Sequence, residues 1–109
     1  MSLDVKTLKN EWAESINNAL SLYDIDENIQ VGILTIEPET RLPEEGYSVH
    51  KGSHEFAYVI EGEVVISTED EEKTVIEGEL TYNSPGTRHY TSNNTKKEAK
   101  LLWFVAPPL

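Results

Sequence analysis

The spacing of apolar and polar residues divides the chain into a helical beginning and a β-rich remainder. Apolar residues recur mostly at steps of three and four over residues 4–23: Leu8, Trp12, Ile16, Ala19, Leu20 and Tyr23. Since this spacing places side chains on one helical face, and Asp4 suits the N-cap, we predict one amphipathic α-helix there. We assign residues 1–26 to an N-terminal helical extension. Its apolar face either covers an open side of the domain, which we favour, or contacts a second subunit.

From residue 27 onward, short β-forming segments alternate with turn signals. Residues 29–36 and 55–68 are rich in β-forming side chains, with Gly62 at a tight bend in the second stretch. Further strand-like segments span residues 73–77, 80–83, 88–92 and 98–105, and residues 38–46 are broken into a loop by prolines and a glycine. Short strands at this spacing are typical of a sandwich or a barrel. We therefore predict an all-β domain over residues 27–109.

The acidic run Glu69–Glu72 lies between two of these strands. It lacks the alternating ligands and central glycine of a calcium loop, so we interpret it as the solvated tip of a hairpin. The chain as a whole has 109 residues, which suits one domain, and a net charge of −11. Such an acidic surface repels phosphate backbones, so we expect no nucleic-acid partner.

Composition also bears on the kinds of site, the cellular location and the oligomeric state of the protein. The chain has no cysteine, which excludes disulfides, thiolate zinc sites and a cysteine nucleophile. No apolar run approaches the ~20 residues of a membrane span, and residues 1–6 lack the features of a signal peptide, so we expect a cytoplasmic protein without membrane contact. The hydrophobic fraction of 38% is low for a lone globule. Together with a predicted outward row of Phe56, Tyr58 and Ile60, it favours a homodimer.

The alternation of side chains along the strands indicates which residues could form a metal site. Side chains alternate between the two faces of a strand, so Glu55 shares a face with Ala57, whereas His54 faces the other way. A hairpin turn over residues 51–53 would bring His50 and Glu55 inward to one point. A later strand that turns His89 inward would complete two imidazoles and one carboxylate. This set suits divalent iron, manganese, zinc or nickel and leaves coordination positions open.

These residues carry a resemblance to the cupin superfamily. The stretch Ser48-x-His50-x4-Glu55-x6-Gly62 is similar to the first cupin motif, G-x5-H-x-H-x3–4-E-x6-G. The stretch Gly78-x7-Gly86-x2-His89-x3-Asn93 resembles the second, G-x5-P-x-G-x2-H-x3-N. The resemblance covers residues 29–106 and implies a jelly-roll β-barrel, a divalent metal ion held by His50, Glu55 and His89, and a small-molecule ligand.

The chain departs from the family pattern at Ser48, where the first metal-binding histidine of the family falls. A serine hydroxyl is a weak neutral ligand, so we expect three protein ligands and more room for water or substrate. We assign Ser48 to the substrate site together with Tyr47 and Tyr82 as pocket walls, although ordinary packing explains both tyrosines equally well. Arg41 is a further substrate-binding candidate, since it could hold a carboxylate at the barrel mouth; a surface ion pair is the alternative.

Three functions fit these observations. The first is a metal-dependent enzyme that acts on a small molecule, and the second is a binding or sensing module without catalysis. The third is a structural cupin whose metal site has degenerated, for which Ser48 is the main argument. Metal content separates the third function from the others, and turnover separates the first from the second.

Overall fold

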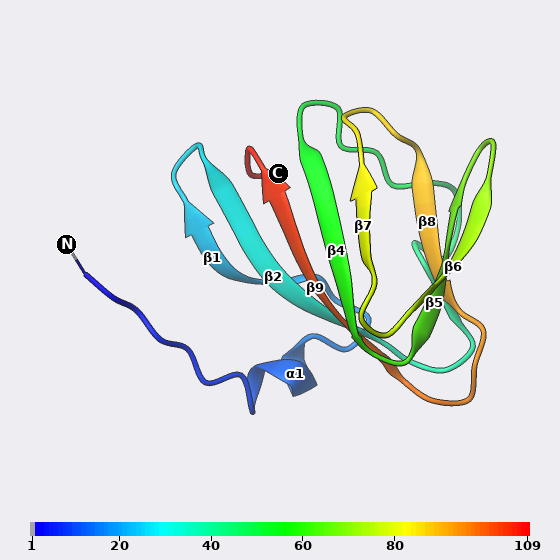
Figure 1. Cartoon of the computed structure of the whole chain (residues 1–109), viewed down its shortest axis with the longest axis horizontal. Helices are drawn as coiled ribbons and strands as arrows, with labels where there is room; N and C mark the ends of the chain where they lie inside the picture. Colours follow the sequence, from blue (N-terminus) through cyan, green and yellow to red (C-terminus); the bar gives the residue numbers. More distant parts are fainter. Residues whose placement is uncertain (1) are drawn as a thin grey trace.

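Two antiparallel sheets face each other in a computed structural model that describes residues 2–109 (Figure 1). The five-stranded sheet contains, in spatial order, β1 (Leu20–Ile25), β2 (Ile29–Ile36), β9 (Ala99–Ala106), β4 (His54–Glu61) and β7 (Leu80–Asn83). The four-stranded sheet contains β3 (Thr40–Leu42), β8 (His89–Asn93), β5 (Glu63–Thr68) and β6 (Glu72–Ile76). The predicted all-β jelly-roll architecture is confirmed, and the sheets leave the barrel open rather than closed by hydrogen bonds.

The core lies between the two sheets. Strand β9 alternates strictly, so that Leu101, Trp103 and Val105 point inward and the residues between them do not. The start of this strand belongs to a cluster of buried apolar side chains from both sheets: Ile36, Val59, Val64, Val75, Ala99 and Leu101. Burial of these side chains fixes the register of each strand, because a slip by one residue would turn its apolar set toward water.

The predicted helix over residues 4–23 is wrong. The only helix in the part of the chain that is described, α1, spans Glu11–Glu14, and residues 20–25 form strand β1 against β2. Asn17 has a φ of 50°, which ends any continuous helix. The edge of β2 needs hydrogen-bond partners, and the backbone of residues 15–17 supplies them: Asn17 N donates to Thr35 O at 2.6 Å and Thr35 N to Ser15 O at 2.9 Å. Sheet pairing therefore outweighs the local helical pattern.

The segment around α1 covers part of the outer face of the five-stranded sheet. The Oγ of buried Ser15 lies 2.9 Å from Oγ1 of Thr35 on β2. The ammonium of Lys100 on β9 lies 5.4 Å from the centre of the Trp12 ring. The expectation that this region covers an open face of the domain thus holds for a much shorter helix than predicted.

Two connections define how the chain passes between the sheets. Gly62, with a φ of 82°, separates β4 in one sheet from β5 in the other, so the continuous β-rich stretch of residues 55–68 bends where predicted. The acidic run forms the β5–β6 hairpin tip, closed by a hydrogen bond of 2.8 Å from Thr68 N to Glu71 O. Strand β3, by contrast, lies in the stretch predicted as loop. Its three residues pair with β8 but are too few to show an alternating pattern.

Asn93 ties three segments together from a fully buried position. Its Nδ2 donates to the carbonyls of Ile36 at 2.9 Å and Lys97 at 2.7 Å, and its Oδ1 accepts from Thr95. The side chain thus joins the end of β2, the end of β8 and the turn into β9. Such a fully satisfied buried amide explains the asparagine in the second motif as a structural residue.

Gly32 provides the space for Trp103. A Cβ at Gly32 would lie 2.2 Å from both the Trp103 ring and the carbonyl oxygen of Leu20. The ring also donates a hydrogen bond of 3.1 Å from Nε1 to the Ile33 carbonyl. It can lie across β2 in this way because residue 32 has no side chain.

We expect Gly32→Ala to lower the free energy of unfolding by about 2–3 kcal/mol, because the added methyl group forces Trp103 or the β1 backbone to move. Urea unfolding followed by tryptophan fluorescence measures this loss. Gly52→Ala is the matched control, since a Cβ there meets nothing within 4 Å. Equal effects of the two substitutions would contradict the steric explanation.

Candidate metal centre

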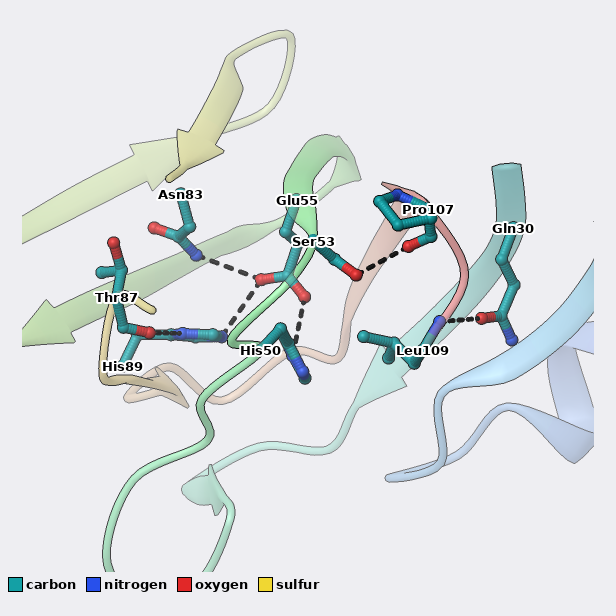
Figure 2. Close-up of polar contacts among 9 residues, drawn as sticks. All are labelled: Gln30, His50, Ser53, Glu55, Asn83, Thr87, His89, Pro107 and Leu109. Atoms are coloured by element: carbon teal, nitrogen blue, oxygen red, sulfur yellow. Dashed lines mark hydrogen bonds and ion pairs between the residues drawn. The ribbon is translucent and has the colours of Figure 1, made fainter. Parts of the chain in front are cut away.

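The side chains of His50, Glu55 and His89 converge between the sheets, as Figure 2 shows. Nε2 of His50 lies 3.1 Å from Oε2 of Glu55, and Nε2 of His89 lies 3.1 Å from Oε1 of Glu55. The centres of the two imidazole rings are 5.5 Å apart. One carboxylate therefore bridges two imidazoles that come from segments 39 residues apart in the sequence.

Backbone pairing places these three residues. Ser48 and His89 exchange backbone hydrogen bonds of 2.8 and 2.9 Å, which holds the segment before β4 against the start of β8. The Gly86 amide donates to the His50 carbonyl at 2.9 Å and adds a second link. Glu55 is the second residue of β4 and shares the inner face with Ala57, as strand parity predicts.

His54 points to the opposite side of β4. Its Nδ1 lies 2.6 Å from the hydroxyl of Tyr82, and the two rings stack with centres 5.8 Å apart. His54 therefore belongs to the outer surface of the sheet. Tyr82, which the sequence suggested as a pocket wall, lies with it and outside the cavity lining, because it alternates with the inward-facing Thr81 and Asn83.

Two further residues orient the site, and the sequence did not identify either of them. Asn83 Nδ2 donates to Oε1 of Glu55 at 3.1 Å, and His89 Nδ1 lies 3.1 Å from the Thr87 carbonyl (Figure 2). Because a carbonyl only accepts, Nδ1 of His89 carries the proton and Nε2 is directed at the site. Inward parity on the first strand of the second motif could have suggested Asn83, but only once β7 is known to pair with β4.

The electrostatics of the cluster favour ionised groups. Burial of the Glu55 carboxyl favours its neutral form, but hydrogen bonds from His89 and Asn83 and the nearby imidazoles outweigh it, so the pKa of Glu55 lies below 4.5. Burial would lower the pKa of His89, yet its hydrogen bond to Glu55, the charge of that carboxylate and the Thr87 carbonyl raise the pKa above 6.5. Each of the two residues thus favours the charged form of the other in the metal-free protein.

The donor set fits a divalent first-row metal ion. Imidazole nitrogen and carboxylate oxygen bind such ions at about 2.0–2.2 Å, so ligands of one ion lie a few ångström apart. The donor atoms of His50, Glu55 and His89 all lie within 4.8 Å of one another. The hydrogen bond from His89 to a backbone carbonyl is the kind of outer contact that orients metal-binding histidines.

A cavity of about 310 Å³ adjoins the three residues. Much of its wall is apolar, and several polar side chains join the triad in the lining: Asn17, Ser48, Thr81, Asn83 and Thr91. Ser48, the position at which the motif lacks a histidine, therefore lies where a small molecule or water would bind. Leu109 also lines the cavity, and its backbone N–H donates to Oε1 of Gln30 at 3.1 Å (Figure 2).

Arg41 and Tyr47, the remaining suggested substrate contacts, do not line this cavity. Arg41 donates to the carbonyls of Glu44 at 3.0 Å and Gly46 at 2.7 Å and stacks over Tyr90 at 3.8 Å. Tyr47 packs against the same Tyr90 ring, with centres 5.6 Å apart. Arg41 therefore stabilises the loop before β4 and does not extend into the interior.

Comparison with known proteins places this geometry in a family. The model of the cupin domain matches residues 32–105. The chain belongs to the cupin family. The match includes both motifs and all three residues of the candidate metal centre, whereas the segment around α1 lies outside it.

Solved structures share the cupin fold at low sequence identity. The TT1209 protein of Thermus thermophilus has a TM-score of 0.76 and 25% identity, over 96% of this chain and 98% of that chain. The cupin domain of Schizosaccharomyces pombe Cnp3 has a TM-score of 0.75 and 12% identity, over 83% of this chain and 64% of that one. A predicted oxalate decarboxylase of Thermotoga maritima has a TM-score of 0.67 and 17% identity, over 76% of this chain and 70% of that chain. No curated protein matches the sequence.

No helix in the described part of this cupin is long and apolar enough to cross a membrane.

The Glu55–His89 pair predicts how the stability of the metal-free cupin depends on pH. Because the pKa of Glu55 is lowered, its contribution is present above about pH 4.5 and is lost as the pH falls through the folded-state value. Because the pKa of His89 is raised, its contribution is present below about pH 6.5 and is lost as the pH rises through the folded-state value.

We therefore expect Glu55→Gln to cost about 2 kcal/mol of unfolding free energy near pH 5.5, and clearly less near pH 8.5, in protein stripped of metal. Urea unfolding at the two pH values measures the difference. Glu27→Gln, at an exposed glutamate in the β1–β2 turn, is the control and should cost little at either pH. A cost of Glu55→Gln that does not change with pH would argue against the pair.

Proposed function

We propose that this cupin binds one divalent metal ion at His50, Glu55 and His89 and takes up a small molecule in the adjoining cavity. The observation that carries the proposal is the convergence of two Nε2 atoms on one carboxylate beside that cavity. Iron, manganese, zinc and nickel all suit this donor set. Bound there, the ion would supply Lewis-acid polarisation of an oxygen on the small molecule.

The remaining residues would prepare the site for this role. Asn83 fixes the orientation of the Glu55 carboxylate, and the Thr87 carbonyl fixes the tautomer of His89. Ser48 leaves room where other cupins have a fourth protein ligand, and its hydroxyl can bind water or the small molecule. With three protein ligands, open coordination positions face the cavity, which is the arrangement of a catalytic rather than a structural metal site. A metal-dependent enzyme is therefore the function we favour over a degenerate site.

The direct test is a melting series with added Zn²⁺, Mn²⁺ or Ni²⁺ at about pH 7.5. An ion at a hundredfold excess over its Kd adds about 2.7 kcal/mol, which for this chain length raises Tm by about 10 °C. His89→Ala should abolish the increase. His54→Ala is the matched control, because it removes a histidine from the outer face of β4 and should leave the increase intact. A melting temperature indifferent to every ion would support the degenerate-site function instead.

Protons should compete with the metal at both imidazoles. Since only neutral imidazole binds a cation and the pKa of His89 is raised, we expect bound metal to be lost as the pH falls from about 7 to about 5. Equilibrium dialysis across that range measures the loss, and Ser48→His should move it to lower pH by adding a fourth ligand. Loss at the same pH in both proteins would show that residue 48 does not face the ion.

We also propose that this cupin forms a homodimer through the outer face of β4 and β7. Large apolar side chains lie exposed there, with Tyr58 at 38%, Leu80 at 59% and Tyr82 at 50%. Phe56 adds to the face by stacking on Phe104 with ring centres 4.9 Å apart. The acidic side chain at the end of β4, Glu61, lies 3.9 Å from the ammonium of Lys100. In a chain of net charge −11, this largely apolar face suits a second copy related by a twofold axis.

Light scattering should give the mass of a dimer for the parent protein, and Tyr58→Glu should give a monomer because it buries a charge at the contact. Ile76→Glu is the matched control, since Ile76 is 51% exposed on β6 of the other sheet. A monomeric parent, or a dimer that survives Tyr58→Glu, would refute this interface.

A further inference from the structure

Apart from the two imidazoles of the triad, the wall of the cavity beside the metal centre is without cationic side chains. None of the residues 2–109 that line it is a lysine or an arginine. The apolar part of the lining comes from both sheets: Leu34, Leu42, Ala57, Ile66, Leu101 and Trp103. Buried anions in proteins are usually paired with a cation or coordinated to a metal, so this wall offers nothing of its own to a phosphate or a dicarboxylate.

Four cations are adjacent in the sequence to lining residues. Lys51, next to His50, lies exposed in the turn before β4, and the other three are engaged elsewhere. Arg41, next to Leu42 of the wall, is held by two backbone carbonyls and the Tyr90 ring. Arg88, next to His89, pairs with Glu69 at 3.1 Å. Lys100, next to Leu101, lies on the outer face between Glu61 and Glu98, at 3.9 and 3.8 Å. Strand alternation turns Arg41 on β3 and Lys100 on β9 away from the cavity, and neither Arg88 nor Lys51 lines it.

The imidazoles do not replace these cations. Nε2 of His50 and Nε2 of His89 both face oxygens of Glu55 at 3.1 Å, so the carboxylate already in the cavity occupies both. A second anion would meet the charge of Glu55 without a free partner. Once a metal ion is bound, that ion is the only positive group that could meet an anionic oxygen.

The size of the cavity limits its occupant further. Its volume of about 310 Å³ is at the lower end of ligand sites, which usually measure about 300–1,000 Å³. At about 30 Å³ per water-sized group, it holds about ten such groups. The hydroxyls of Ser48, Thr81 and Thr91 are the neutral polar groups in the wall beside the triad, together with the Asn17 and Asn83 amides.

We propose that the substrate or ligand of this site is a neutral, mainly apolar molecule of about ten non-hydrogen atoms with one polar oxygen-bearing end. This inference rests on the proposed function, in which the polar end meets the metal.

Benzamide and benzoate provide a matched pair of probes with the same shape and different charge. Binding is followed by the fluorescence of Trp103, which lines the cavity, in a Trp12→Phe background that removes the other tryptophan. The titrations use metal-free protein at about pH 8, where free histidine is neutral. We expect benzamide to bind at least about tenfold more tightly than benzoate. Equal or tighter binding of benzoate, or no binding of benzamide, overturns the proposal.

Substitution of a cavity residue tests whether benzamide binds inside the cavity. Ala57→Leu adds three carbon atoms to the cavity wall and should abolish the benzamide signal, whereas Ala13→Leu, at an exposed position in α1, should not. Thermal melting confirms that both variants are folded. Benzamide bound equally by both variants lies outside the cavity and refutes the inference.

The two proposals fail in different ways. Zinc that leaves the melting temperature unchanged, with the benzamide preference intact, refutes the metal site and leaves the neutral cavity standing. Zinc that stabilises the protein, with benzoate preferred in the metal-free state, refutes only the substrate class. Adding Zn²⁺ should reduce the difference in affinity between benzamide and benzoate, because the ion gives the benzoate carboxylate a partner.

Discussion

The Glu55 carboxylate is the constraint on which the interior of this cupin depends. It joins an imidazole from the segment before β4 to an imidazole at the start of β8, and Asn83 on β7 holds one of its oxygens. These contacts link the two sheets across the space between them. Apolar side chains large enough to link the sheets there would fill the cavity. A half-buried carboxylate is tolerated there because each of its oxygens lies 3.1 Å from an imidazole nitrogen.

The same interaction prepares the site for a cation. Against the effect of burial, the Glu55 carboxylate raises the pKa of His89 and so favours a proton on that imidazole in the metal-free protein; a divalent ion would take the place of this proton. Under the proposed function, metal binding would exchange one cation for another in a geometry that is already formed. This explains how a site with serine at position 48 retains its shape. One cation also suffices to balance the charge of the single Glu55 carboxylate, so the cavity wall needs no lysine or arginine for this purpose.

Much of the β-fold and the three converging residues could be predicted, because strand alternation is a local property and both motifs are short. The helix over residues 4–23 could not be excluded locally, since Leu20 and Tyr23 suit either element and the edge of β2 decided between them. The orientation of Arg41 and Tyr82 depends on Tyr90 and His54, which are distant in the sequence. The role of Asn83 likewise depends on strand pairing, which the sequence does not specify.

X-ray absorption at the zinc edge of protein loaded with one equivalent of Zn²⁺ tests the central claim most directly. The account predicts two imidazole nitrogens and carboxylate oxygen at about 2.0–2.2 Å, and the loss of one imidazole in His89→Ala. A spectrum with oxygen ligands alone, unchanged by His89→Ala, would show that zinc binds to the acidic surface and would contradict the proposed centre.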